Sequence, residues 1–274
     1  MKKILLSIFT ITFIFSMSAA FATNTYDIEE LNLSITAPEG WITISRNIDE
    51  NKPAEELLGF SASYLVDFLE SRLIYIDFLV PDGSEEIFIT MSENEDSQRL
   101  VSLNGYSEAQ LKPFIESVMG LTIDEIKKYA EDNSISAMDT QDIEWLGYEI
   151  YNHNQALFVK FYYNKIIDGV EVPSFQYSTV QNGQSINISA SSYTGELSDD
   201  IEIITKQVID SIVFTKIEEP KRGIDFYEVI KSGLIYGCIT GIVALLFLTI
   251  KKKKDLNSTP SDIDKIDSSY TENE

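Results

Sequence analysis

One uncharged apolar run near the end of the chain constrains its folding more than any other feature. The run extends from Gly233 to Ile250 and is followed at once by Lys251 to Lys254. About 18 apolar residues are roughly what a helix needs to cross the hydrocarbon core of a bilayer. Lysines beside such a helix mark its cytoplasmic end. We therefore expect a transmembrane helix over 231–250, with the preceding residues outside the cell and the following ones in the cytoplasm.

The start of the chain predicts export in the same orientation. Two lysines precede an apolar stretch over 4–17, and Ala20-Phe21-Ala22 follows as an A-x-A cleavage site. This pattern is typical of a secretory signal peptide, which we assign to 1–22. An uncleaved anchor is the alternative, and either arrangement exports the residues that follow. The two-lysine start and the compact apolar core favour a bacterial source.

The remaining segments divide the chain into a type I, single-pass membrane protein. Residues 23–215 are long enough for one extracytoplasmic domain with a substantial core. A short charged juxtamembrane linker covers 216–230 and contains Pro220 and Gly223. The tail over 251–274 is polar, rich in Ser, Asp and Thr and nearly free of apolar residues, so it is expected to be disordered in the cytoplasm.

Charge and residue usage exclude several kinds of chemistry. The formal net charge of −23 argues against nucleic acid and anionic lipid headgroups as ligands, because phosphate binding needs clustered Lys and Arg. The only cysteine, Cys238, lies in the apolar run, so the outer domain has no disulfide. The only histidine, His153, falls in a predicted turn, and zinc or Ser-His sites need imidazoles that are not there. No metal or cofactor is expected.

Periodicity predicts an α+β domain with a central antiparallel sheet covered by helices. Alternating residues indicate strands, and apolar residues three and four apart indicate helices. The predicted order is a β-hairpin over 31–46 around Pro38-Glu39-Gly40, a helix over 53–70, a hairpin of strands 73–80 and 86–91, a solvated loop over 92–99, helices over 107–120 and 122–130, strands over 143–151, 156–163, 171–180 and 184–192, and a closing helix over 198–212.

Turn and capping residues place the boundaries of these elements. Asp-Gly at 168–169 and Asn-Gly at 182–183 are suited to tight hairpin turns, so the last four strands should form a meander. Ser107 and Thr122 each begin a capping pattern, and Ser198 is the expected N-cap of the closing helix. Within strand 171–180 one face is more aromatic, and Pro173 indicates an edge or bulged position.

Two short patches resemble the ends of PsbP-like domains. Pro38-Glu39-Gly40-Trp41 is similar to the P-x-G-W turn with which these domains often begin. The closing stretch Val208 to Phe214, which ends in Ser211-Ile212-Val213-Phe214, is similar to their final helix and S-[IF]-x-[FV] ending. The resemblance implies an α/β sandwich with a central antiparallel sheet. That fold serves photosystem accessory subunits, transport cofactors and lipoproteins, so no active-site motif is implied. The C-terminal transmembrane anchor departs from the family.

Aromatic side chains offer one candidate binding surface in the outer domain. Trp41, Trp145 and Tyr148 are its expected members. Packing in the core and across strands is the alternative role for the same rings.

Three glycines offer a candidate contact surface in the anchor. Gly233, Gly237 and Gly241 are spaced four apart, which places them on one face of a helix where two backbones approach closely. The anchor is therefore a candidate for homodimerisation, although small residues are also common in membrane helices without such a role.

These patterns favour a binding or accessory domain without catalytic activity, displayed outside the cell on a single anchor. Its partner is expected to be a protein, which the sequence does not identify. A carboxylate-dependent hydrolase of the cell envelope is the alternative, and two carboxylates about 5 to 9.5 Å apart in one cleft would favour it. A transmembrane signalling or docking protein is a weaker alternative, because the tail is too short for a catalytic domain.

Overall fold

The computed structural model describes residues 24–93, 95–132, 140–167, 169–192, 194, 196–219 and 239–240. The predicted signal peptide and the cytoplasmic tail lie outside these ranges, as do most of the linker and all of the predicted transmembrane helix except Ile239 and Thr240. Within the described ranges, no helix combines the length and the apolar character needed to cross a bilayer.

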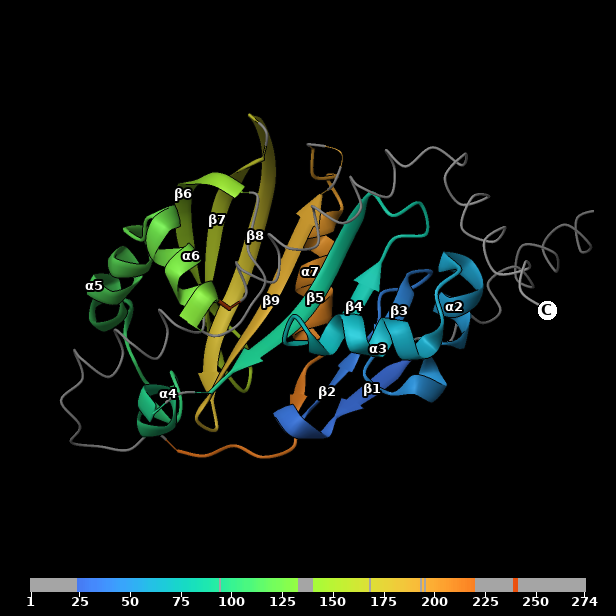
Figure 1. Ribbon diagram of the computed structural model, residues 1–274. Helices are drawn as coiled ribbons and strands as arrows, with labels where there is room; N and C mark the ends of the chain where they lie inside the picture. Colours follow the sequence, from blue (N-terminus) through green and yellow to red (C-terminus); the bar gives the residue numbers. More distant parts are fainter. Residues whose placement is uncertain are drawn as a thin grey trace, which may run out of the picture.

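A seven-stranded antiparallel sheet forms the centre of the domain, which is an α+β fold (Figure 1). Its strand order is β3-β4-β5-β9-β8-β7-β6. The strands are β3 (Ile42–Ser45), β4 (Ile74–Leu79), β5 (Glu85–Ser92), β6 (Thr140–Asn152), β7 (Leu157–Ile167), β8 (Val170–Gln181) and β9 (Gln184–Ser192). The predicted hairpin of β4 and β5 and the predicted meander from β6 to β9 are both present.

A smaller three-stranded sheet joins the two ends of the domain. It has the order β1-β2-β10 and consists of β1 (Thr25–Ile28), β2 (Leu33–Thr36) and β10 (Val213–Phe214). The predicted hairpin over 31–46 is therefore wrong, because β2 pairs with β1 and β10 whereas β3 pairs with β4. Gly40, at φ +78°, occupies the turn that carries the chain from one sheet to the other.

The helices differ from the prediction in two places. The described helices are α2 (Lys52–Leu58), α3 (Ala62–Glu70), α4 (Glu95–Leu100), α5 (Glu108–Met119), α6 (Ile123–Asp132) and α7 (Ile201–Asp210), with 3-10 turns η1 (Glu29–Leu31) and η2 (Ile48–Glu50). The single helix predicted over 53–70 is split at Gly59, which has φ +72° and ends α2. Ser61 then caps α3 by accepting the Tyr64 N–H. Helix α4 replaces most of the loop predicted over 92–99.

Two of the three predicted helix starts are confirmed. Gln110 accepts the Ser107 N–H at 2.9 Å before α5, and Glu125 accepts the Thr122 N–H at 2.8 Å before α6. Ser198 does not cap α7, whose N-cap is Asp200. The N–H and the hydroxyl group of Ser198 instead donate to the two carboxylate oxygens of Glu85, at 2.5 and 2.8 Å.

Each face of the large sheet is covered by its own apolar core. Helices α3, α5 and α6 lie over one face, and α7 with the small sheet lies over the other (Figure 1). The first core includes Leu65, Phe88, Leu111, Ile115, Phe161 and Ile239, and the second includes Leu31, Phe78, Phe175, Tyr177, Val208 and Phe214. Because successive strand residues point to opposite faces, Phe161 and Tyr162 contribute to different cores.

The chain leaves the domain beside the turn between β8 and β9. Asn182, in this turn, donates from its side-chain amide to the Lys216 carbonyl at 2.8 Å. Its amide oxygen accepts the Glu218 N–H at 2.9 Å. The Thr215 N–H also donates to the Asn32 carbonyl at 2.8 Å. These bonds hold the start of the predicted linker against the domain.

Candidate functional site

A recess of about 300 Å³ opens where β8 extends past the end of β9. The β8–β9 ladder begins at the pair Ser174 and Ser191, so Pro173 lies just beyond it and meets only β7 there. The predicted edge position of Pro173 thus holds locally, although β8 is an inner strand. The lining residues come from β6, β7, β8, α7 and the segment before α7: Leu146, Tyr162, Tyr163, Pro173, Ser174, Phe175, Leu197, Ser198, Asp199, Ile201 and Glu202.

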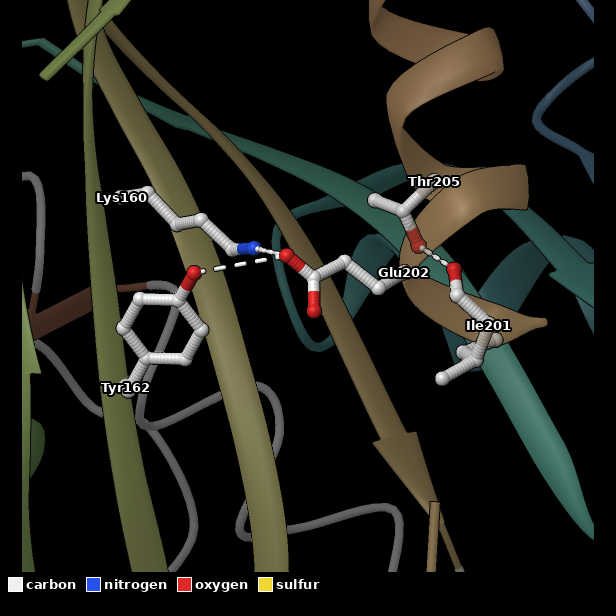
Figure 2. Close-up of polar contacts among 5 residues, drawn as sticks. All are labelled: Lys160, Tyr162, Ile201, Glu202 and Thr205. Carbon is white, nitrogen blue, oxygen red and sulfur yellow. Dashed lines mark hydrogen bonds and ion pairs between the residues drawn. The ribbon is translucent and has the colours of Figure 1, made fainter. Parts of the chain in front are cut away.

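A buried lysine sits against one wall of this recess. Lys160, in β7, is only 1% exposed, and its ammonium group forms an ion pair with Glu202 of α7 (Figure 2). The Tyr162 hydroxyl also donates to the same carboxylate oxygen of Glu202, at 3.4 Å. The first turn of α7, which holds Glu202 in place, contains a further hydrogen bond from the Thr205 hydroxyl to the Ile201 carbonyl at 2.7 Å.

Three aromatic rings surround the Lys160 ammonium group. Its nitrogen lies 4.3 Å from the Tyr162 ring centroid, 4.7 Å from that of Phe175 and 5.1 Å from that of Tyr177. Burying a charge is costly unless it is paired. Here the carboxylate of Glu202 and the negative faces of the three rings together offset that cost. The site therefore shows that these rings accept a cation.

The tyrosines of this wall stay in the neutral form over the physiological pH range. Burial raises the pKa of Tyr162 well above its usual value, and the nearby carboxylates of Glu149 and Glu202 raise it further. Burial and the charge of Glu202 likewise raise the pKa of Tyr177. Tyr162 thus acts as a hydrogen-bond donor and as an aromatic surface, and it does not carry charge.

A second polar group lies along α7 from the recess. The Tyr151 hydroxyl donates to Asp210, and Lys206 pairs with the other carboxylate oxygen of Asp210 at 2.5 Å. Burial opposes ionisation of Asp210, but these two donors outweigh it and lower its pKa. The nearby His153 is half-buried against the Phe158 ring, and burial lowers its pKa. This arrangement fixes the β6–β7 turn to α7.

On the opposite face, Lys165 and Ser191 form a pair that sequence reasoning did not find. The Lys165 nitrogen donates to the Ser191 hydroxyl at 2.8 Å, and both side chains are 0% exposed. Burial lowers the pKa of Lys165 to about 7, although the charge of Glu86 opposes this shift. A lysine next to a serine is one way to activate a nucleophile.

The backbone around Ser191 does not support acyl transfer. Strand β9 pairs with β5 on one side and β8 on the other. Its N–H groups at Ser191 are therefore used in the sheet, and none is left to stabilise an oxyanion. We interpret Lys165 and Ser191 as a polar pair of the core.

The three aromatic residues predicted from the sequence to form a binding surface lie apart in the structure. Trp145 and Tyr148 pack against the first core, and the Trp145 ring lies 5.4 Å from that of Tyr163. Trp41 packs against the second core, on the other face of the sheet. These three side chains do not form one surface, and a binding role for any of them stays a prediction.

The glycines predicted to form a contact surface in the anchor cannot be placed. Gly233, Gly237 and Gly241 fall outside the described residues. Within the described residues, no group of three or more His, Cys, Asp or Glu is placed to hold a metal ion.

The recess itself was missed because its parts are far apart in the sequence. Lys160 and Glu202 are separated by 42 positions. One signal was available: Lys160 stands between Phe158 and Tyr162 at an inward-facing position of β7, where an apolar residue is expected. The predicted aromatic face of β8 is confirmed, since Phe175 and Tyr177 both contribute to the second core and to the rings around Lys160.

These features define an α+β domain with a central antiparallel sheet. No family model matches the sequence, and a comparison with curated proteins found no match. Among solved structures, the chain is similar to cyanobacterial PsbP (CyanoP) from Synechocystis sp. PCC 6803. The two share 12% sequence identity, with a TM-score of 0.41, over 72% of this chain and 95% of that chain. The likeness concerns the fold alone and assigns no function.

Proposed function

We propose that this protein is a membrane-anchored, extracytoplasmic binding or accessory domain without catalytic activity. The observation that carries the proposal is the recess between β7, β8 and α7. It has the volume of a small ligand pocket, and it combines apolar and aromatic walls with a few polar groups, as binding pockets do. Strands β7 and β8 are packed on both faces, so the recess is built on rigid elements.

The engagement of Glu202 favours binding over hydrolysis. Asp199 and Glu202 both line the recess, and this is the observation that favours a carboxylate-dependent hydrolase as the second candidate. Hydrolysis of that type uses one carboxyl group as an acid and another as a base or nucleophile. Glu202 instead accepts hydrogen bonds from Lys160 and Tyr162. It serves the structure of the wall, so that among the described residues lining the recess Asp199 has no second free carboxylate beside it.

In this proposal, the membrane location of the domain and the kind of partner it binds are inferred from the sequence. The apolar run over 233–250, with four lysines after it, anchors the domain on the outer side of the cell membrane. The net charge of −23 favours a basic protein partner over nucleic acid. Self-association through Gly233, Gly237 and Gly241 is a further part of the proposal, and a docking role for the cytoplasmic tail is its weaker alternative.

Site-specific photo-crosslinking in native membranes tests the binding proposal. A photoreactive residue replaces Leu146, which lines the recess and is 58% exposed, in the full-length chain. Lys112 on α5, with a side chain that is 59% exposed, is the matched control position. We expect a discrete cross-linked species from position 146 that position 112 does not give. No adduct at 146, or the same adducts at both positions, would contradict the proposal.

A further inference from the structure

We propose that the outer edge of β6 binds an extended basic segment of a partner protein, which adds to the large sheet as a further strand. The inference rests on the proposed binding function and names the kind of partner and the surface that it contacts. It follows from the position of β6 in the sheet, from a bulge in this strand, and from the charges that the bulge brings together.

Strand β6 forms a long open edge of the large sheet, on the side away from β3 (Figure 1). It has 13 residues, whereas the opposite edge strand β3 has only 4. Among the described strands β6 pairs only with β7, and no backbone hydrogen bond between described residues joins it to another segment. An edge strand directs a row of backbone N–H and C=O groups outward. Addition of an extended peptide to such an edge is a recurring mode of protein recognition.

A bulge in β6 places two carboxylates on the same face of the sheet. Glu144 and Glu149 are five positions apart, which in a regular strand directs their side chains to opposite faces. A register shift lies between them, and their partners on β7 are Asn164 and Lys160, four positions apart. Lys160 points to α7, where it pairs with Glu202. Both carboxylates therefore lie on the α7 side, roughly 13 Å apart along the edge at about 3.3 Å per residue.

The surface beside this edge is acidic. Glu144 and Glu149 are both exposed, and the Asn164 side chain donates to Glu144 at 3.2 Å and to the exposed Glu171 of β8 at 3.4 Å. Strand β6 contains no Lys or Arg, and the two lysines of β7 are buried. A second copy of β6 would bring carboxylates against carboxylates, which is unfavourable between paired strands. Charge complementarity therefore selects a segment that carries Lys or Arg over a second copy of this chain.

An apolar contact lies between the two carboxylates. Leu146 is 58% exposed and also lines the recess. Among the described residues, only chain neighbours have atoms within 4 Å of the point where a Cβ on Gly147 would stand, so there is room here for another side chain. An added strand with basic residues opposite Glu144 and Glu149 places the residue midway between them on the same face, beside Leu146. The expected motif is therefore two basic residues four positions apart with an apolar residue midway.

Binding of a peptide with this motif to the purified full-length protein tests the inference, with fluorescence anisotropy of a fluorescein label as the readout. The probe is the amidated peptide TKTVTKT. One control peptide, TETVTET, reverses the charge, and another, TKKVTTT, keeps the charge but changes the spacing. We expect the probe to bind about tenfold more tightly than TETVTET, and also more tightly than TKKVTTT. Binding of either control as tight as that of the probe would overturn the proposal.

A double variant of the protein locates the binding to the edge of β6. Glu144→Gln combined with Glu149→Gln should weaken binding of the probe about fivefold, because each exposed ion pair contributes modestly. Both side chains are exposed, so the substitutions leave the core intact. The matched control combines Glu55→Gln with Glu56→Gln, which changes the charge equally on α2, beside the opposite edge strand β3. Equal weakening by the two double variants would show a general charge effect and overturn the assignment to β6.

N-methylation of the probe tests the strand pairing itself. Only alternate N–H groups of a strand point toward a given neighbour. One version of the probe is methylated at its second, fourth and sixth amides, and the other at its third and fifth. We expect one version to lose binding and the other to retain it. Equal binding of the two versions would contradict strand addition.

The cross-link at position 146 separates this inference from the proposed function. A discrete cross-link there, without binding of the probe, leaves the binding function standing and rejects only the basic strand. Absence of the cross-link contradicts the proposed function itself.

Discussion

At the scale of single residues, strand β7 is unusual because it carries two buried lysines whose side chains lie on opposite faces of the sheet. Lys160 meets a carboxylate and three rings, whereas Lys165 meets Ser191 and the charge of Glu86. Neither lysine was nominated from the sequence. Alternation showed which strand residues share a face, but the partners of a buried charge come from other strands and helices, so their chemistry appears only when the fold is known.

The lowered pKa of Lys165 predicts a pH-dependent stability. In the unfolded chain a lysine has a pKa of about 10.4, whereas Lys165 in the folded domain has a pKa of about 7. Between these values the unfolded state binds more protons, so raising the pH stabilises the folded state by up to about 1.4 kcal/mol per pH unit. Below pH 7 this contribution to the slope disappears.

The variant Lys165→Met checks this slope. Urea unfolding of the full-length protein at pH 7.5, 8.5 and 9.5 should show the unmodified protein gaining stability relative to Lys165→Met as pH rises. Lys112→Met, on the exposed face of α5, is the control. A constant stability difference between the unmodified protein and Lys165→Met over this range would contradict the burial of a neutral lysine.

At the scale of elements, local residues predicted helices and hairpins better than they predicted pairing between distant strands. Ser107 and Thr122 begin α5 and α6 as expected, because capping involves neighbours along the chain. The partners of β2 could not be predicted in this way. Its pairing with β10 joins Leu33 to Phe214, and no turn residue between them specifies that contact. Gly59 was a signal for the break between α2 and α3, but continued apolar spacing through 57–69 concealed it.

Asn51 illustrates how one side chain joins two elements. It is 0% exposed, and its amide group accepts the Ser45 N–H and donates to the Ser45 carbonyl, both at 2.8 Å. These bonds attach the end of the edge strand β3 to the start of α2. Asn51→Ala leaves two buried backbone groups without partners, so we expect a loss of about 3 kcal/mol in the free energy of unfolding.

The exposed Asn47 in the same segment is a suitable comparison. Its side chain accepts the Asp49 N–H at 3.2 Å and donates to the Glu50 carboxylate at 2.9 Å, and both bonds are exposed to solvent. Asn47→Ala should therefore cost about 1 kcal/mol or less. Chemical denaturation of both variants measures the difference, and equal losses would show that the Asn51 contacts are not a special attachment.

At the scale of the whole molecule, the two ends of the domain are joined and the exit of the chain is held. The small sheet brings β10 beside β2, and the side chain of Gln155 accepts the Phe214 N–H at 2.7 Å. Beyond β10, Asn182 binds the backbone at Lys216 and Glu218. The direction in which the linker leaves the domain is thus set by the turn between β8 and β9.

Replacing Asn182 by glycine tests this attachment. Asn182 has φ +54°, a conformation that glycine also adopts, so Asn182→Gly keeps the turn and removes only the two side-chain hydrogen bonds. We expect faster amide hydrogen exchange at Glu218 and a loss of stability of about 1 kcal/mol. Asn32→Gly, at φ +52°, is the control because Thr215 contacts its backbone carbonyl. Unchanged exchange at Glu218 in Asn182→Gly would contradict the attachment.

Strand β8 acts as a spacer between the exit of the chain and the recess. Asn182 lies at one end of β8, just after Gln181, whereas Pro173 and Phe175 lie toward the other end. From Pro173 to Gln181 the strand advances eight residues, or roughly 26 Å at about 3.3 Å per residue. If the exit faces the bilayer and β8 lies along the membrane normal, the recess stands at most about that distance above the headgroups, which is close to the thickness of a hydrocarbon core. A ligand would then be met at that height in the cell envelope, and a partner embedded in the membrane would need an outer domain of its own to reach it.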